Sequence, residues 1–192
     1  ATLTALPKNF GYNQSIMILV FVVLGGIGST RGSMIAAVVL TLLPELLRGI
    51  CDATDIPWIR LLYCYPDKIT DELVAEIRDN PRIVKYIDIP IQHISDTVLR
   101  RMNRHGGSDV IKDAVAKLRR EVPGIVLRST AIVGFPGETD EDFRQLCEFV
   151  KEAKFERFGA FTYSREEDTP AYGFDGQIDE QVKQDRYDIV MQ

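Results

Sequence analysis

The 192-residue chain has 45% hydrophobic residues and a net charge of −5, both ordinary for a globular protein. The acidic balance leaves no direct footprint for binding nucleic acid. Three widely spaced cysteines exclude a disulfide framework, so we expect a reducing compartment, the cytoplasm.

Charge is spread unevenly along the chain. Residues 1–50 hold three basic residues and one acidic residue, whereas residues 51–192 hold 20 basic and 27 acidic residues. The two parts therefore suit different surroundings, and we divide the chain after residue 48.

Residues 1–48 are expected to form an apolar helical segment. Residues 1–13 lack the charged start and cleavage site of a signal peptide. Two apolar runs, 15–28 and 34–47, follow and flank a polar break. Each is shorter than the roughly 20 residues that span a bilayer as a straight helix. The sequence leaves open two short membrane segments, with membrane contact through residues 14–48, or a buried hairpin of soluble helices.

From residue 51 onward, strands and helices alternate. Apolar, β-branched runs predict the strands, and helical apolar spacing after capping residues predicts the helices, with Thr70 and Ser95 as N-caps. The expected strands are residues 58–65, 86–89, 126–133 and 158–163, and the expected helices are residues 71–78, 95–102, 108–120, 140–153 and 180–192. Such alternation predicts an α/β fold with a parallel sheet over residues 49–165. Residues 166–192 are expected to be an acidic connector and a terminal helix cut off by the chain end.

The stretch Ile125–Thr139 is the centre of this pattern. Gly134, Pro136 and Gly137 stop its strand abruptly, and acidic residues then begin a helix. Ligands of α/β proteins bind at such carboxyl ends of strands. A tight turn without a ligand is the alternative interpretation.

Three polar side chains stand out near these strand ends. Gln92 and His93 follow the second strand, where His93 suits a general base or a histidine that bonds loop backbone. Arg128 lies among apolar neighbours and needs a carboxylate or phosphate partner. That partner is either a ligand or a nearby acid such as Asp88.

Three spaced segments, Trp58–Pro66, Asp88–His93 and Leu127–Thr139, carry a family resemblance. In this order they resemble the radical-SAM methylthiotransferases over roughly residues 43–192. The RimO type, which modifies an aspartate of a small-subunit ribosomal protein, is the most similar, because histidine follows glutamine at position 93. The relatives that modify tRNA are the alternative within the class.

The resemblance implies a fold, a reaction and site residues. The family fold is a partial (β/α) barrel of six strands, of which this chain would hold about four. The family transfers a methylthio group with two S-adenosyl-L-methionine (SAM) molecules and two [4Fe–4S] clusters. By resemblance, Arg128 binds the SAM carboxylate, Gly134 and Phe135 flank the adenine, and Gln92 and His93 line the cavity where SAM meets a ribosomal-protein substrate.

The cysteines depart from the family pattern. The family holds one cluster with a Cys-x3-Cys-x2-Cys loop and the second with cysteines of a separate domain, and this sequence has neither. Cys64 and Cys147 are expected to be core residues. We therefore predict no metal ligand here, and a fragment that is inactive alone, since the family's radical chemistry needs an electron from a cluster.

A second resemblance covers the first part of the chain. Residues 21–33 and 40–48 resemble the late membrane segments of branched-chain amino-acid ABC-transporter permeases, so a membrane-transport fragment is the alternative function. The segment Leu43–Arg48 fits both families. We therefore hypothesise a chimera of two gene fragments joined there.

Overall fold

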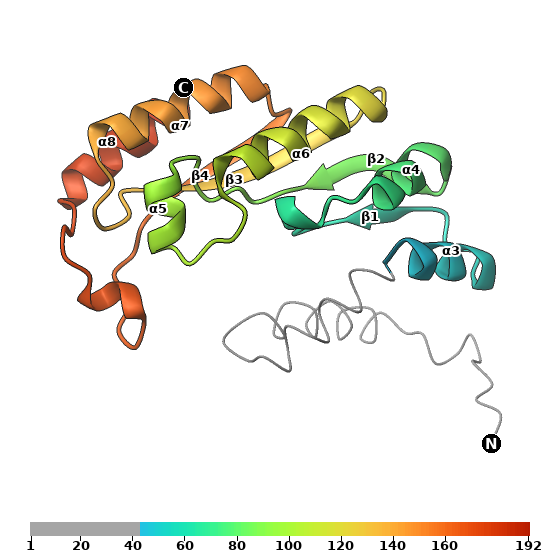
Figure 1. Cartoon of the computed structure of the whole chain (residues 1–192), viewed down its shortest axis with the longest axis horizontal. Helices are drawn as coiled ribbons and strands as arrows, with labels where there is room; N and C mark the ends of the chain where they lie inside the picture. The colour runs from blue at the N-terminus through green and yellow to red at the C-terminus, as the bar shows by residue number, and fades with distance from the viewer. Residues whose placement is uncertain (1–42) are drawn as a thin grey trace. The chain divides into compact units, whose positions relative to one another are not determined.

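The computed structural model describes residues 43–192, and Figure 1 labels their helices and strands. The chain divides between Pro57 and Trp58 into two units, which we describe separately. In the first unit, helix α3 (Leu43–Ala53) buries Pro44, Leu47 and Cys51 at helical spacing.

The predicted membrane-like segment is not supported where it can be examined. Helix α3 carries Glu45 and Arg48 and is amphipathic rather than uniformly apolar. Within residues 43–192, no helix combines the length and apolar character needed to cross a bilayer. The rest of the predicted segment, residues 14–42, lies outside the described residues.

The second unit is built on a parallel sheet, which confirms the predicted α/β class. Its strands lie in the order β1-β2-β3-β4, and each neighbouring pair is parallel. The strands are β1 (Ile59–Leu61), β2 (Ile83–Asp88), β3 (Val126–Val133) and β4 (Arg157–Thr162).

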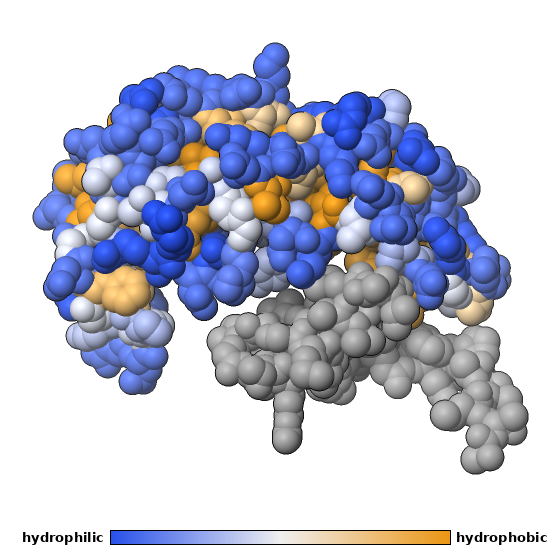
Figure 2. All heavy atoms as spheres, viewed as in Figure 1, coloured by the Kyte–Doolittle hydropathy of each residue, from blue (hydrophilic) through white to orange (hydrophobic). Residues whose placement is uncertain are grey.

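Helices connect the strands and cover one face of the sheet (Figure 1). Right-handed crossovers between consecutive parallel strands place the connecting helices on the same side. The helices are α4 (Asp71–Asp79), α5 (Asp96–Arg101), α6 (Gly107–Glu121), α7 (Asp140–Ala153) and α8 (Glu180–Val190), with short 3-10 turns η2 (Pro66–Lys68) and η3 (Pro170–Gly173). Figure 2 shows mostly hydrophilic residues on the outward helix surfaces, with apolar residues between them.

Alternate side chains of the central strand β3 point to the two faces of the sheet. Leu127, Ser129, Ala131 and Val133 are fully buried on the helix-covered side, whereas the alternate residues, Arg128 among them, are only partly buried. Residues in register on parallel strands point to the same side, so Asp88 of β2 and Arg157 of β4 share the face of Arg128. We call this side, which α4–α8 leave uncovered, the open face.

Strand β1 is shorter than the predicted 58–65. Tyr63 adopts a left-handed φ of 58°, and its N–H turns toward Asp88 Oδ2 at 3.4 Å. The next amide, of Cys64, donates to the Asp88 carbonyl at 2.8 Å. The chain therefore leaves the extended conformation to wrap the end of β2.

The predicted helix caps have different outcomes. Thr70 caps α4, since its hydroxyl accepts the Leu73 N–H. Ser95 occupies the N-cap position of α5 without a capping bond, because its hydroxyl donates to Asp142 instead. Ser95 therefore ties the loop after β2 to α7.

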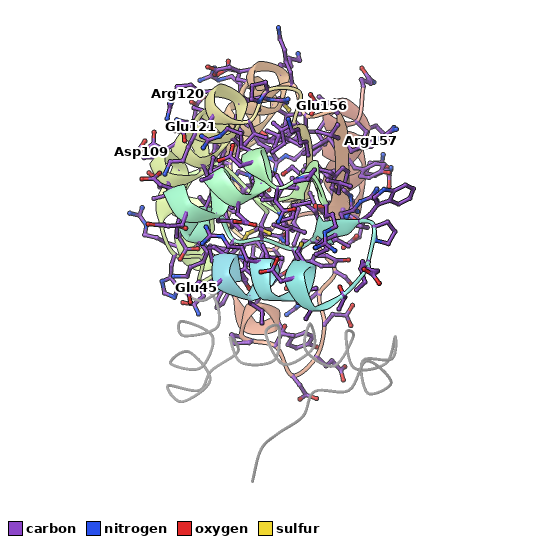
Figure 3. The ribbon with its side chains drawn as sticks, turned by 90° about the vertical axis from the view of Figure 1, so that its right-hand side faces the viewer. Glu45, Asp109, Arg120, Glu121, Glu156 and Arg157 are labelled. Atoms are coloured by element: carbon purple, nitrogen blue, oxygen red, sulfur yellow. The ribbon has the colours of Figure 1, made fainter. Side chains whose placement is uncertain are left out.

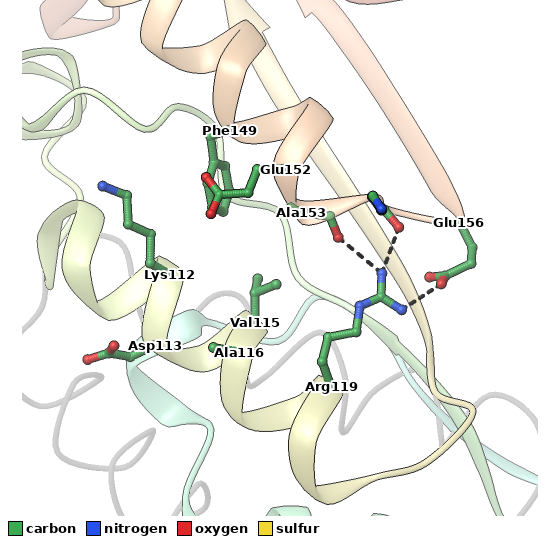
Figure 4. A pocket seen from close by; sticks show the side chains of 10 residues that line it. Lys112, Asp113, Val115, Ala116, Arg119, Phe149, Glu152, Ala153 and Glu156 are labelled. Carbon is green, nitrogen blue, oxygen red and sulfur yellow. Dashed lines mark hydrogen bonds and ion pairs between the residues drawn. The ribbon is translucent and has the colours of Figure 1, made fainter.

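Arg119 fixes the opposite end of the sheet, where the strands begin. Its guanidinium donates to the Ala153 and Lys154 carbonyls at 3.2 and 2.7 Å and to Glu156 at 2.5 Å (Figure 4). A groove between α6 and α7 lies beside it, with Val115 and Phe149 in its lining. Figure 3 faces this end and shows Arg120 of α6 on one side and Arg157 of β4, next to Glu156, on the other.

Candidate functional site

The candidate site lies at the edge where the parallel strands end. Gln92 continues β2 beyond Pro90 and pairs with β3 at Ala131. Its N–H donates to the Thr130 carbonyl at 2.9 Å, and its carbonyl accepts the Ile132 N–H at 2.7 Å. Gln92 has a φ of 67°, so the backbone bends sharply there. The bend brings the loop after β2 beside β3.

Arg128 and Asp88 form an ion pair across adjacent strands on the open face. Arg128 Nη1 lies 3.2 Å from Asp88 Oδ2. The Asp88 side chain is 0% exposed and the Arg128 side chain 42% exposed. Asp88 Oδ1 is buried and has no hydrogen-bond partner within the described residues. Arg128 is therefore paired with Asp88, one of the two partners that the sequence allows, while its side chain stays partly exposed on the open face.

His93 lies in the interior instead of on the open face. Its side chain is 0% exposed, and its Nδ1 accepts the Ser95 N–H at 2.9 Å. Since Nδ1 is the acceptor, a neutral His93 carries its proton on Nε2, which lies 3.6 Å from Glu138 Oε2. His93 therefore accepts a hydrogen bond from loop backbone, which is the alternative to a general base that the sequence allows.

Glu138 secures the turn after β3. Its Oε2 accepts the Gly134 N–H at 2.8 Å and the Phe135 N–H at 3.4 Å. Its Oε1 accepts from Arg186 of α8 at 2.8 Å. A carboxylate buried without a cation would be costly, so the Arg186 contact explains how Glu138 stays in this position.

Gly134 and Phe135 lie beneath the C-terminal part of the chain. Gly134 has a φ of 75°, and a Cβ there would lie 2.4 Å from Lys183 Cγ. Phe135 is buried, with its ring edge-on to Tyr163 at 5.1 Å and to Phe174 at 6.2 Å. Both residues therefore contact the segment that follows β4.

A second polar group links the loop after β2 to helix α7. Asp142 accepts the Ser95 hydroxyl, and its Oδ2 accepts the Thr139 N–H at 2.9 Å. Burial raises the pKa of Asp142, but the hydrogen bonds from Ser95 and Thr139 outweigh it and hold the pKa below its usual value. Asp142 is therefore a charged structural tie.

Only Cys51 is a core residue, whereas Cys64 and Cys147, predicted to be in the core, are partly buried. Cys51 and the other two cysteines are free, and within residues 43–192 no group of His, Cys, Asp and Glu is arranged to hold a metal ion. Burial, with Asp88 adding to it, raises the pKa of Cys64 to about 12. Cys64 is thus a neutral thiol at physiological pH, which is a poor metal ligand.

Sequence reasoning missed Lys183 and Arg186. Both are nearly fully buried on α8, at 1% and 7% exposure. Arg186 and its partner Glu138 are separated by 48 positions, so no local pattern joins them. The weak amphipathic pattern of α8 gives no sign that two cations face inward.

Comparison with known protein families assigns the chain. A family model described as the radical SAM superfamily matches residues 23–150. The chain belongs to the radical SAM superfamily. This match begins inside the stretch that resembles a permease, twenty residues before Leu43.

Several curated relatives share about half of the matched positions with this radical SAM chain. The ribosomal protein uS12 methylthiotransferase RimO of Pelobacter propionicus is 54% identical over 151 residues, 79% of this chain and 34% of the relative. The proteins of the same name from Geobacter sulfurreducens and Clostridium novyi are 53% and 51% identical over 149 residues, 78% of this chain and 33% and 34% of those relatives. The chain spans about a third of the length of the curated relatives it matches.

A solved structure supports the fold. The radical S-adenosylmethionine methyltransferase TsrM from Kitasatospora setae superposes with a TM-score of 0.51 at 22% identity, covering 67% of this chain and 25% of TsrM. That structure contains cobalamin and a [4Fe-4S] cluster. At this identity the likeness shows that both chains share the α/β arrangement.

Proposed function

We propose that this chain is a part of a RimO-type methylthiotransferase, which adds a methylthio group to an aspartate of ribosomal protein uS12. One observation carries the proposal: 50–54% identity over about 150 residues to relatives that all bear this name. The reducing setting expected from the cysteines fits a cytoplasmic enzyme.

We further propose that the four-stranded sheet is a section of the family's partial barrel. Its strands are all parallel and occur in sequence order, as in a (β/α) barrel. The open face would then be the inner wall of that barrel. Residues 49–165 would form this section and residues 166–192 the connector and terminal helix, with the boundary of the N-terminal part near residue 48.

The residues present suit the amino-acid end of SAM. Asp88 Oδ1 is buried and unpartnered within the described part of the chain, and Arg128 contacts Asp88 through Nη1 alone. Arg128 can therefore offer its remaining N–H groups to a carboxylate on the open face. When bound, SAM would supply the radical and the methyl group of the family's reaction. Gln92, at the bend beside Arg128, is proposed as a further contact.

The other three proposed cofactor residues are buried in contacts of their own. His93, Gly134 and Phe135 belong to the loops after β2 and β3, which the Glu138 and Asp142 contacts join. We propose that they shape the cofactor cavity through these loops. Their direct contact with SAM stays a prediction.

The described residues do not suit a [4Fe–4S] cluster. No cysteine group within residues 43–192 can hold one, and the sequence has no Cys-x3-Cys-x2-Cys loop. Cluster ligands would come from other parts of a longer methylthiotransferase.

A graft tests the proposed function. Residues 44–192 replace the matching segment of Geobacter sulfurreducens RimO in cells that lack their own RimO, and mass spectrometry measures uS12. We expect uS12 to gain one methylthio group on an aspartate. The same graft with Arg128→Ala should leave uS12 unmodified, whereas Arg144→Ala, on the outer surface of α7, should not change the result. An inactive graft that is soluble and retains its clusters would refute the proposal.

A further inference from the structure

Helix α8 grips the turn after β3 through a buried arginine. Arg186 Nη1 donates to the Glu138 carboxylate at 2.8 Å and to the Glu138 carbonyl at 3.2 Å. Its Nη2 donates to Asp140 at 2.7 Å. The Glu138 side chain is 0% exposed and the Asp140 side chain fully exposed. The inner contact to Glu138 is therefore the one that water cannot replace.

A buried lysine on the same helix lies against Gly134. The Lys183 side chain is 2% exposed, and its ammonium reaches Glu180 at 2.6 Å. The ammonium also lies 5.2 Å from the centre of the Tyr163 ring. The Lys183 stem fills the space next to the Gly134 Cα, where a Cβ would overlap it. Lys183 can therefore pack in this position only because residue 134 is a glycine.

These contacts connect α8 to both loops at the strand ends. Glu138 Oε2 accepts the Gly134 N–H, and it also lies 3.6 Å from His93 Nε2. A shift of Arg186 would thus move Glu138 and change its contacts with the turn after β3 and with the loop after β2. Helix α8 also packs against β3 and β4, and its contacts with the turn after β3 run through Glu138 and Gly134.

We propose that Arg186 and Lys183 are positioning residues for cofactor binding, which act by holding the turn Gly134–Glu138 in place, with Gly134 in its left-handed conformation. This inference rests on the proposed function, since it assumes that the turn borders SAM. The Glu138 carboxylate is the intermediary: it binds two turn amides on one side and the α8 cation on the other.

The first test measures the turn without any cofactor. In the full chain, hydrogen exchange of the Gly134 and Phe135 amides is followed by NMR, with the Ala131 amide in β3 as an internal reference. We expect Arg186→Ala to speed exchange at both turn amides by about tenfold or more and to leave Ala131 unchanged. Asp140→Ala is the matched control, because it removes only the outer, exposed contact of Arg186.

The second test measures SAM binding to the same proteins by calorimetry. We expect Arg186→Ala to raise the Kd about ten- to hundred-fold, Arg186→Lys to lie between, and Asp140→Ala to match the wild type. Partial rescue by lysine separates positioning by charge from simple packing.

The outcomes distinguish the two proposals. If amide exchange is faster in Arg186→Ala but the wild-type chain does not bind SAM, the result supports the positioning role and counts against the proposed function. Unchanged exchange at Gly134 and Phe135 would overturn the positioning role. If Arg186→Ala fails to fold, Arg186→Lys is used instead. Amide exchange in Arg186→Lys that is no faster than in Asp140→Ala would then overturn the positioning role.

Discussion

The Arg128 guanidinium lies 3.2 Å from the Asp88 carboxylate, one strand away on the open face. The two residues are in register on β3 and β2. The Asp88 side chain is fully buried, whereas the Arg128 side chain stays 42% exposed and so keeps surface available for a ligand. This asymmetry is what makes the pair a candidate anion-binding position.

Removing Arg128 should destabilise the fold through Asp88. We expect Arg128→Ala to lower the free energy of unfolding by about 1–3 kcal/mol, because Asp88 loses its cation while it stays buried. The double variant Asp88→Ala/Arg128→Ala should recover part of this loss. Urea unfolding of the wild type, the two single variants and the double variant measures the coupling energy between Asp88 and Arg128. Additive effects on the free energy of unfolding would show that the pair contributes nothing.

Gly134 should be intolerant of a side chain because of Lys183. A Cβ at position 134 would lie 2.4 Å from Lys183 Cγ, in a backbone with a φ of 75°. We expect Gly134→Ala to lower stability by about 2–4 kcal/mol. Adding Lys183→Ala removes the overlapping Cγ and should restore part of the loss, although the backbone strain stays. Thermal melting of the single and double variants tests this, and no restoration would contradict the contact.

Cys64 should titrate far above an ordinary thiol. Its pKa is raised to about 12, chiefly by burial, against about 8.5 for a free cysteine. As the pH rises, the Cys64 thiol is therefore deprotonated in the unfolded state before it is in the folded state. The contribution of Cys64 to stability is constant below the unfolded-state pKa and declines as the pH rises toward 12. In brief alkylation pulses, the Cys64 rate should keep increasing with pH where that of a model thiol levels off. A plateau near the model thiol would contradict the assigned burial.

The two threonine caps should differ in strength. Thr70 accepts one backbone N–H at the start of α4, so Thr70→Ala should cost about 1 kcal/mol. Thr139 accepts the Asp142 N–H and also donates to the Asp142 carboxylate at 2.6 Å in a capping box. We expect Thr139→Ala to cost about 2 kcal/mol. Chemical unfolding compares them, and equal losses would show that the carboxylate contact adds nothing.

Much of the fold could be predicted from local pattern. The bounds of β3 and α7 agree with the predicted 126–133 and 140–153, because an apolar run ended by glycines and a Thr-led cap are strong local signals. The start of β2 was missed by three residues, since Ile83–Lys85 mixes apolar and charged residues at an edge of the pattern. The apolar first part falls mostly outside the described residues.

The site was less accessible to sequence reasoning. Arg128 was identified because a charge within an apolar strand needs a partner, and Asp88 was among the partners considered. The positions of His93 and Gly134 depend on Glu138, Lys183 and Arg186, which meet only in the folded chain. In the sequence Glu138 is one of the acidic residues that begin a helix, and no local signal shows that its carboxylate turns back to the Gly134 N–H.

The affinity of the full chain for SAM tests most directly whether the open face between β2 and β3 carries the cofactor. Calorimetry compares the wild type with Arg128→Ala and with Arg144→Ala, a surface arginine of α7 that pairs with Glu141. We predict that the wild type and Arg144→Ala bind SAM alike and that Arg128→Ala binds at least about tenfold more weakly. Equal binding by all three proteins, or none by the wild type, would contradict the assignment of this face.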